Sequence, residues 1–193
     1  MSSSYTKTRI MVECALMIAL GTILANIKIY ELPNGGSITL FSMVPFILVS
    51  FRHGVKWGLF TGFVNSLLQM LLGFYAPPAP GLLPLVGMIL LDYVLAFGVM
   101  GIAGLGRGKP HGIFWGSVLG GAARFVVHYI SGITIYKILA PTEIFGTVFH
   151  NPALYSLIYN GSYVVIDLVL CLVIFGILYA PLKTYMTGAD LRR

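Results

Sequence analysis

The stretch ALYSLIYNGSYVVIDLVLCLVIFGILYA, residues Ala153–Ala180, decides the class of fold. Asp167 is the one side chain in it that carries a full charge. A membrane-spanning helix needs about 20 predominantly apolar residues, so this stretch predicts a helix that crosses a bilayer. The whole chain of 193 residues has the same character, with 58% hydrophobic and 9% charged residues. Because soluble domains carry about 25% charged residues, this composition predicts an integral membrane protein and excludes a soluble or disordered chain.

Five further apolar segments predict that the chain crosses the bilayer six times. The expected fold is therefore an all-α integral membrane protein with six transmembrane helices, and residues 1–193 are expected to form a single transmembrane domain. Lys7 and Arg9 precede the apolar stretch of the first segment, as in a signal peptide, but further spans follow at once and no clear cleavage site appears, so we expect a retained helix. The polar loop Asn26–Thr39 contains a Pro-Asn-Gly-Gly turn signal. The five segments are Arg9–Ala25, Ser37–Phe51, Val55–Tyr75, Leu85–Leu105 and Ile113–Tyr136.

Lysine and arginine residues gather on one side of this topology. Nine lie at the two termini and in the turns after the second and fourth spans, whereas two lie in the other three loops. Cytoplasmic loops carry the excess of positive charge in membrane proteins, so both termini are expected in the cytoplasm. The net charge of +6 thus reports topology and does not point to nucleic acid as a partner. The nine are Lys7, Arg9, Arg52, Lys56, Arg107, Lys109, Lys183, Arg192 and Arg193, and the two are Lys28 and Lys137.

The sequence offers no set of catalytic, metal-binding or cofactor-binding residues. The basic turn around Lys109 loosely resembles a phosphate-binding loop, but Ala103 and Pro110 stand where a Walker A motif needs Gly and Ser or Thr. Neither HExxH nor GxSxG occurs, and Cys14 and Cys171 are far apart. We therefore expect no enzyme activity, no metal and no cofactor, and any ATPase motor must be a separate protein.

Three polar residues on three different spans are expected at one level of the bilayer. From the outer ends of their helices, Asp92, His128 and Asn160 lie roughly 10–12 Å deep at a rise of about 1.5 Å per residue. Ionisable groups are costly inside a membrane and mark functional sites there. The three side chains either hydrogen-bond the helices together or form a pocket, open to the outside, that binds a small polar ligand.

Arg124 and Asp167 are expected to form a structural ion pair at the floor of this pocket. Arg124 lies four residues before His128 and hence on the same helix face. Its depth of about 18 Å is close to the depth of about 20 Å for Asp167, and a buried arginine needs a partner. Asn65 and Gln69 share one face of the third span and either pack helices together or contact the ligand.

Small residues at a spacing of four let helices approach closely. Internal packing between spans is one explanation for each set. Ala15 and Ala19 on the first span can instead form an outward face that docks another membrane protein. The other sets are Gly54, Gly58 and Gly62, and Gly116 and Gly120.

Taken together, these features resemble a known family. A six-span chain of this length with Ala15 and Ala19 on the first span and no ATPase of its own is similar to the substrate-binding S-components of energy-coupling factor transporters. Within that group it resembles the thiamine-specific subunits over essentially its whole length. The matching segments are Pro33-Asn34-Gly35-Gly36-Ser37-Ile38-Thr39-Leu40, Asp92-Tyr93, Arg124-Phe-Val-Val-His128-Tyr-Ile-Ser-Gly132 and Tyr155-Ser-Leu-Ile-Tyr-Asn160-Gly161.

The resemblance implies a set of binding residues and a partner. Ala15 and Ala19 would dock an energising module made of one transmembrane subunit and two ATPases. The sequence departs from the family at Asp92, where glutamate is frequent, at Tyr136, where tryptophan occurs, and in the first outer loop, where some members carry a tryptophan that is absent here. The residues implied to bind substrate are Asp92, Tyr93, His128, Tyr136, Tyr155 and Asn160.

The implied function is high-affinity capture of thiamine outside a prokaryotic cell and its delivery across the cell membrane. Thiamine has a cationic thiazolium and an aminopyrimidine, which suit a carboxylate and aromatic faces. An S-component for another vitamin or for a thiamine precursor is the nearest alternative. Two others belong to different classes: an intramembrane enzyme that uses Asp92 and His128 as an acid–base pair, and a small channel.

Overall fold

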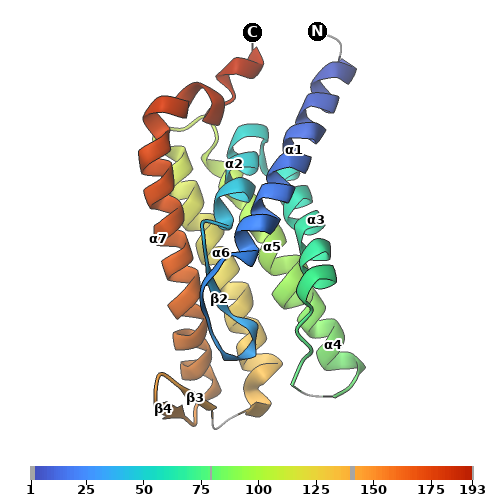
Figure 1. The fold of residues 1–193 in the computed structure, drawn as a ribbon, viewed down its shortest axis with the longest axis vertical. Coiled ribbons are helices and arrows are strands. Elements are labelled where there is room, and N and C mark those ends of the chain that lie inside the picture. The colour runs from blue at the N-terminus through green and yellow to red at the C-terminus, as the bar shows by residue number, and fades with distance from the viewer. Residues whose placement is uncertain (1–2, 79, 140–141, 193) are drawn as a thin grey trace.

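The computed structural model, shown in Figure 1, describes residues 3–78, 80–139 and 142–192. Long helices run side by side, and the two ends of the chain lie at the same end of the bundle. This arrangement confirms the predicted all-α membrane fold of six helices. The helices are α1 (Ser3–Asn26), α2 (Met43–His53), α3 (Val55–Gly73), the column that begins with α4 (Leu82–Met88), α6 (Gly112–Thr134) and α7 (Pro152–Met186).

The fourth column changes its helical type along its length. After α4 it continues as a π-helical segment, η2 (Ile89–Leu95), then α5 (Ala96–Gly98) and the 3₁₀ segment η3 (Val99–Gly106). A π-helical turn is wider than an α-helical one and is frequent at functional sites. Asp92 lies in this segment, so the wider turn sets the direction in which its carboxylate points.

Local sequence signals explain where the helices begin and turn. Asn151 caps α7, because its side-chain oxygen accepts hydrogen bonds from the backbone N–H groups of Ala153 (2.9 Å) and Leu154 (3.4 Å). Pro152 follows at the first helical position, where its missing N–H has no cost. Between α2 and α3, Gly54 adopts a φ of 98°, which glycine reaches without steric strain.

Two short hairpins stand in place of loops. Strands β1 (Lys28–Glu31) and β2 (Ser37–Thr39) pair antiparallel around the turn η1 (Pro33–Gly35), and β3 (Thr142–Ile144) pairs with β4 (Thr147–Phe149). The expected second span, Ser37–Phe51, was therefore wrong at its beginning, because its first residues are strand β2 and the helix begins at Met43. The short segments η4 (Tyr136–Leu139) and η5 (Ala189–Arg192) complete the described elements.

Length and apolar composition together separate the candidate spans from the other helices. Within the described residues, four helical columns are long and apolar enough to cross a membrane: Lys7–Asn26, Leu82–Gly106, Gly112–Thr134 and Pro152–Leu191. Helix α2 has 11 residues and a length of about 16 Å at 1.5 Å per residue, so it does not cross alone. The β1–β2 hairpin continues from it toward the far end of the bundle (Figure 1), where it lines the cavity described below, as non-helical backbone at membrane depth does.

The glycines spaced by four on α3 and α6 lie where helices touch. A side chain on Gly58 would overlap Gly101, one on Gly62 would overlap the Phe97 carbonyl, and one on Gly116 would overlap the Ala103 carbonyl. These glycines therefore serve internal packing. The apolar core beside them is built from α1, α2, η3, α6 and α7 and contains Ile18, Met43, Phe46, Ile47, Phe51, Met100, Ile113, Cys171, Phe175 and Met186.

We expect Gly62→Ala to lower the stability of the protein by about 1–3 kcal/mol, because the added methyl group overpacks the contact with Phe97. Gly176→Ala on α7 is the matched control, since a side chain there meets nothing within 4 Å. Thermal unfolding of both variants in the same detergent measures the difference. Equal melting temperatures would mean that close packing at Gly62 is not needed.

Candidate functional site

A cavity of about 310 Å³ opens in the half of the molecule that lies away from the two termini. Its walls come from the β1–β2 hairpin, the end of α3, the π-helical segment, α6 and α7. The structure brings all six predicted substrate-binding positions to this one cavity. The lining includes Asp92, Tyr93, His128, Tyr136, Tyr155 and Asn160, together with Asn34, Gly36, Gln69, Tyr75, Arg124, Tyr159 and Tyr163.

One wall carries a carboxylate that two neighbours on α6 hold in place. The Oδ1 atom of Asp92 lies 3.1 Å from Nδ1 of His128, and Oδ2 accepts a hydrogen bond of 2.7 Å from the Ser131 hydroxyl. His128 and Ser131 are three residues apart, on one face of the helix. The other ring nitrogen of His128, Nε2, has no protein partner among the described residues. The pair therefore fixes the acid and leaves one imidazole nitrogen for a ligand.

Tyr93 lines the cavity with its ring and uses its hydroxyl to hold the chain after α3. The hydroxyl accepts from the Tyr75 backbone N–H (2.9 Å) and donates to the Gly73 carbonyl (3.4 Å), and the ring stacks on Phe74 at 5.8 Å. Tyr136 enters the cavity from η4 at the end of α6. The two tyrosines thus present aromatic surface from two different elements.

A second wall is a column of tyrosines on α7. Tyr155, Tyr159 and Tyr163 recur every fourth residue and are in ring contact, with centroid distances of 5.4 Å and 5.8 Å. Tyr163 also meets the His128 ring edge-on at 5.8 Å. The column therefore runs from the hairpin turn at Asn34, which bonds Tyr155, to the Asp92–His128 pair.

The β1–β2 hairpin rests on this column. The Tyr159 hydroxyl donates to the Pro33 carbonyl and accepts from the Gly36 N–H (2.8 Å), and the Tyr155 hydroxyl accepts from the Asn34 side chain (3.3 Å). A side chain on Gly36 would overlap the Tyr159 hydroxyl, so glycine is required for this close approach. The turn Pro33-Asn34-Gly35-Gly36, expected as a loop, covers one side of the cavity.

Asn160 lies at the centre of a hydrogen-bond network that joins α6 and α7. Its Nδ2 donates to the carbonyl oxygens of His128 (3.2 Å) and Ser156 (3.0 Å) and to the Ser156 hydroxyl (3.0 Å), and its Oδ1 accepts from Tyr163 (2.8 Å). The amide therefore holds α6, which carries His128, against the tyrosine column of α7. For Asn160 this agrees with the first of the two expectations, that the polar residues hydrogen-bond the helices together. Asn160 also lines the cavity, so this residue both joins two helices and forms part of the pocket.

The direct ion pair predicted between Arg124 and Asp167 is not present among the described residues. Asp167, 2% exposed, accepts instead from the backbone N–H (2.9 Å) and the hydroxyl (3.2 Å) of Thr39. The Arg124 guanidinium lies over the Phe97 ring at 5.2 Å and lines the cavity floor. The prediction was wrong because it rested only on the similar depths of Arg124 and Asp167 in the bilayer. The actual partner of Asp167, Thr39, lies on strand β2, in a segment for which a loop or a helix was expected.

The other positions selected from the sequence lie in different places: between helices, in the cavity lining, or on the exposed surface of α1. Asn65 is fully buried and its Oδ1 accepts from Thr22 on α1 (3.3 Å), so it joins helices, whereas Gln69 one turn away lines the cavity. Ala15 and Ala19 are exposed on α1, while Cys14 and Ile18, each one position before an alanine, are buried.

Tyr159, Tyr163 and Ser131 are functional candidates that the sequence analysis did not select, whereas Tyr155, the first member of the column, is among the residues that the resemblance implied. A signal for the column was present, since Tyr155, Tyr159, Tyr163 and Asp167 repeat at a spacing of four along one helix face. Ser131 had no such signal, because its role depends on the direction of Asp92 across two helices.

Comparisons with known proteins agree with this architecture. The family described as thiamine transporter protein (Thia_YuaJ) matches residues 11–186. The chain is 33% identical over 188 residues to the thiamine transporter ThiT of Bacillus subtilis (strain 168), covering 88% of this chain and 89% of that protein. It is 30% identical over 163 residues to the thiamine transporter ThiT of Lacticaseibacillus paracasei, covering 78% and 77%. A solved structure of ThiT from Listeria monocytogenes superposes with a TM-score of 0.76 at 22% identity, covering 93% of this chain and 98% of that one, which shows the same fold.

We expect Tyr159→Phe to loosen the β1–β2 hairpin, because it removes the hydroxyl that bonds Pro33 and Gly36. Two hydrogen bonds contribute together about 1–3 kcal/mol, so hydrogen–deuterium exchange in residues 33–39 should rise roughly tenfold or more. Tyr179→Phe is the matched control, because that tyrosine packs on Phe114 away from the hairpin. Unchanged exchange in Tyr159→Phe would show that the hairpin is held by other contacts.

Proposed function

The chain belongs to the thiamine transporter protein family, and on this premise we propose that its cavity binds thiamine itself and that Asp92 is the principal polar contact. Membership places the chain among bacterial membrane transport proteins and not among enzymes. The intramembrane enzyme is therefore set aside, and the chemistry of the Asp92–His128 pair is assigned to binding.

The observation that carries the proposal is a held carboxylate facing a wall of aromatic rings. Asp92 receives hydrogen bonds from His128 and Ser131, so its position is set before a ligand arrives. A carboxylate accepts strong hydrogen bonds from an amino group and offsets positive charge. The aromatic rings of the tyrosines that line the cavity can stack on flat rings and attract a cation. These two walls match the aminopyrimidine and the thiazolium of thiamine.

The imidazole of His128 offers the ligand a hydrogen-bond acceptor at a fixed position. Because Nδ1 of His128 faces Asp92, the tautomer that donates there leaves Nε2 as an acceptor. An acceptor beside a carboxylate suits a ligand with N–H donors. The cavity of about 310 Å³ lies at the lower end of the range of about 300–1,000 Å³ for small-molecule sites, in keeping with a ligand of two small rings and a short tail.

Delivery of the ligand requires a second protein, and we assign its docking face to α1. Ala15 and Ala19 point away from the bundle, beside the exposed side chains of Met11, Leu16 and Ile23. Small residues on an exposed helix face let a partner helix approach closely. The proposed partner is the transmembrane subunit of an energising module with two ATPases.

Asp92→Asn keeps the shape of the side chain and removes its charge, so we expect thiamine binding to weaken by about 2 kcal/mol or more. Asp92→Glu should be tolerated better, because it restores a carboxylate. Glu143→Gln, on the β3–β4 hairpin outside the cavity lining, is the matched control. Calorimetry on the purified proteins measures the change, and an Asp92→Asn affinity equal to that of the parent would refute the assignment. Mass spectrometry of the ligand that co-purifies separates thiamine from another vitamin or a precursor.

Ala15→Trp combined with Ala19→Trp should leave thiamine binding to the isolated protein unchanged and abolish both complex formation with the module and ATP-driven uptake, because two indoles prevent close helix contact. Val173→Trp places the same bulk on the exposed surface of α7 and should affect neither. Binding and complex formation are measured on the same purified variants. Loss of both activities in the double variant would show that the alanines support the fold.

A further inference from the structure

Arg52, at the last turn of α2, is buried although it is a cation next to the expected cytoplasmic surface. It is 1% exposed and is the largest of the fully buried side chains. Its guanidinium has five N–H donors, and the structure supplies five acceptor contacts. Nε and Nη2 bond Glu13 at 2.6 Å and 3.0 Å, Nη1 and Nη2 bond Asp190 at 2.6 Å and 2.8 Å, and Nη1 also bonds the Tyr185 carbonyl.

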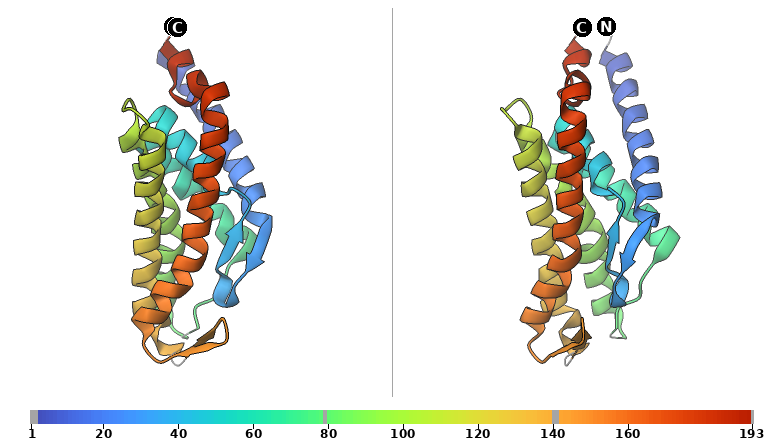
Figure 2. Two further views of the ribbon diagram at one scale, coloured as in Figure 1. Left: turned by 90° about the vertical axis from the view of Figure 1, so that its left-hand side faces the viewer. Right: turned by 60° about the vertical axis from the view of Figure 1, so that its left-hand side comes forward.

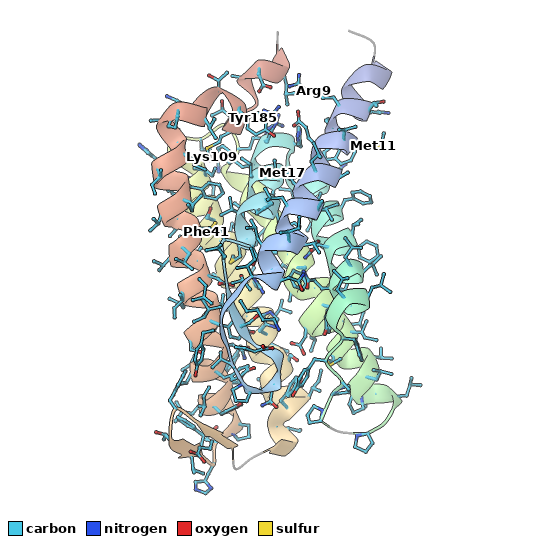
Figure 3. The ribbon with its side chains drawn as sticks, viewed as in Figure 1. Arg9, Met11, Met17, Phe41, Lys109 and Tyr185 are labelled. Carbon is cyan, nitrogen blue, oxygen red and sulfur yellow. The ribbon has the colours of Figure 1, made fainter. Side chains whose placement is uncertain are left out.

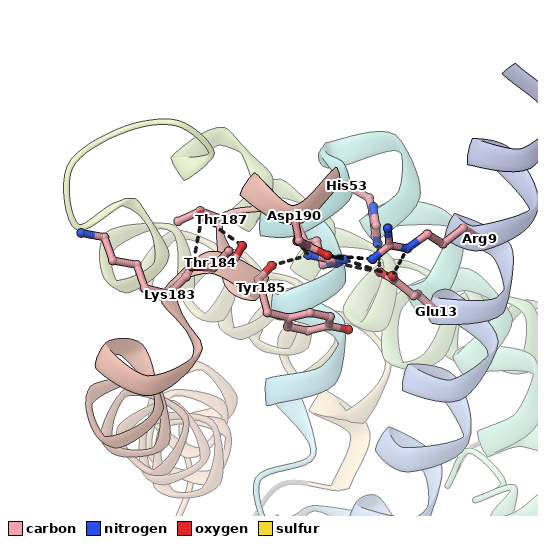
Figure 4. Close-up of polar contacts among 9 residues, drawn as sticks. Arg9, Glu13, His53, Lys183, Thr184, Tyr185, Thr187 and Asp190 are labelled. Atoms are coloured by element: carbon pink, nitrogen blue, oxygen red, sulfur yellow. Dashed lines mark hydrogen bonds and ion pairs between the residues drawn. The ribbon is translucent and has the colours of Figure 1, made fainter. Parts of the chain in front are cut away.

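These contacts join three segments that are far apart in the sequence. Glu13 belongs to α1, Arg52 to α2, and Tyr185 and Asp190 to the end of α7 and the following segment η5. Figure 4 shows Glu13, Tyr185 and Asp190 gathered at this cluster. The guanidinium also lies over the Tyr185 ring at 3.9 Å. Figure 3 shows that Arg9 and Tyr185 lie at the same end of the molecule as the termini. The cluster is therefore a clamp between the first helix and the last.

The charges within the clamp are balanced. Arg9 bonds the same two acids, Glu13 at 3.1 Å and Asp190 at 2.7 Å, so two arginines face two carboxylates. Nε2 of His53 adds a contact of 2.8 Å to Glu13. A buried charge that loses its partner is strongly destabilised, and each member of the clamp therefore depends on the others staying in place.

The clamp holds α1 from the side opposite its alanines. Glu13 and Ala15 are two residues apart and hence about 200° apart around the helix, at 100° per residue. Cys14 and Ile18 are the buried hydrophobic side chains among those that the structure describes on α1. Since so few apolar contacts anchor this helix, the ion cluster is its main directional contact at the cytoplasmic end.

We propose that Arg52 is a positioning residue for docking: together with Glu13 and Asp190 it fixes the rotation and tilt of α1, so that the Ala15 and Ala19 face is presented to the partner. This inference rests on the docking face assigned above and adds the device that holds it. The C-terminal segment thereby belongs to the docking machinery, although it carries none of the docking face itself.

Asp190→Asn is the first test, because Asp190 lies on η5 at the periphery and its substitution keeps the size of the side chain. Spin labels on Met11→Cys and Lys109→Cys report the distance between α1 and the basic turn, while Cys14 and Cys171 are buried and stay unlabelled. The parent should give a narrow distance distribution and Asp190→Asn a broad one. Asp190→Glu restores the carboxylate and should restore the narrow distribution.

The same variants, without labels, are then tested for thiamine binding and for complex formation with the energising module. We expect Asp190→Asn to keep the thiamine affinity within about twofold and to weaken complex formation by about tenfold, since α1 loses its fixed orientation. Arg52→Lys keeps the charge but not the fork of donors and should behave like Asp190→Asn. Lys56→Gln removes an exposed cation of α3 from the same end and should change nothing.

Each contrary result identifies what is wrong. A narrow distribution in Asp190→Asn would overturn the clamp, and a broad distribution with full complex formation would overturn its role in docking. Loss of thiamine binding together with complex formation would assign Asp190 to general folding and overturn the positioning role. If the parent protein itself does not bind the module, both the proposed docking face and the positioning role are refuted. The distance distributions still show in that case whether the clamp exists.

Discussion

The two hydrogen bonds that Asp167 accepts from Thr39 tie the irregular part of the molecule to its longest helix. A carboxylate at this depth is costly unless its oxygens are satisfied, and Thr39 offers both a backbone and a side-chain donor. The contact fixes the end of β2 against α7 and thereby sets where α2 begins. The hairpin before it lies on the tyrosine column, and α2 after it leads to Arg52. The segment that this buried acid holds therefore lies between the cavity and the clamp along the chain.

Helix α2 is the element through which the two ends of the molecule are connected. Thr39 and Ser42, whose hydroxyl oxygens are 2.5 Å apart, precede its first turn at the cavity, and Arg52 lies in its last turn at the clamp. The cavity and the clamp therefore contact the two ends of one helix of 11 residues.

Much of the site followed from the sequence, because span boundaries and helical rise fix depth. That argument brought Asp92, His128 and Asn160 to one level, and all three line one cavity. Depth does not fix the rotation of a helix, so Arg124 and Asp167 were paired at matching depths although Thr39 takes the carboxylate. Arg52 was counted as a charge that sets topology, since its acidic partners lie 39 and 138 residues away. The β1–β2 hairpin was not predicted, because the turn signal Pro33-Asn34-Gly35-Gly36 is equally typical of a loop.

The tyrosine-lined cavity also determines how occupancy can be seen. The two indoles of the chain, Trp57 and Trp115, lie outside the cavity lining, whereas Tyr75, Tyr93, Tyr136, Tyr155, Tyr159 and Tyr163 belong to it. A ligand that stacks in the cavity changes the surroundings of phenol rings and touches neither indole. Its optical signature therefore belongs to the tyrosine bands of near-ultraviolet absorption and circular dichroism, and tryptophan emission would report on surroundings outside the cavity instead.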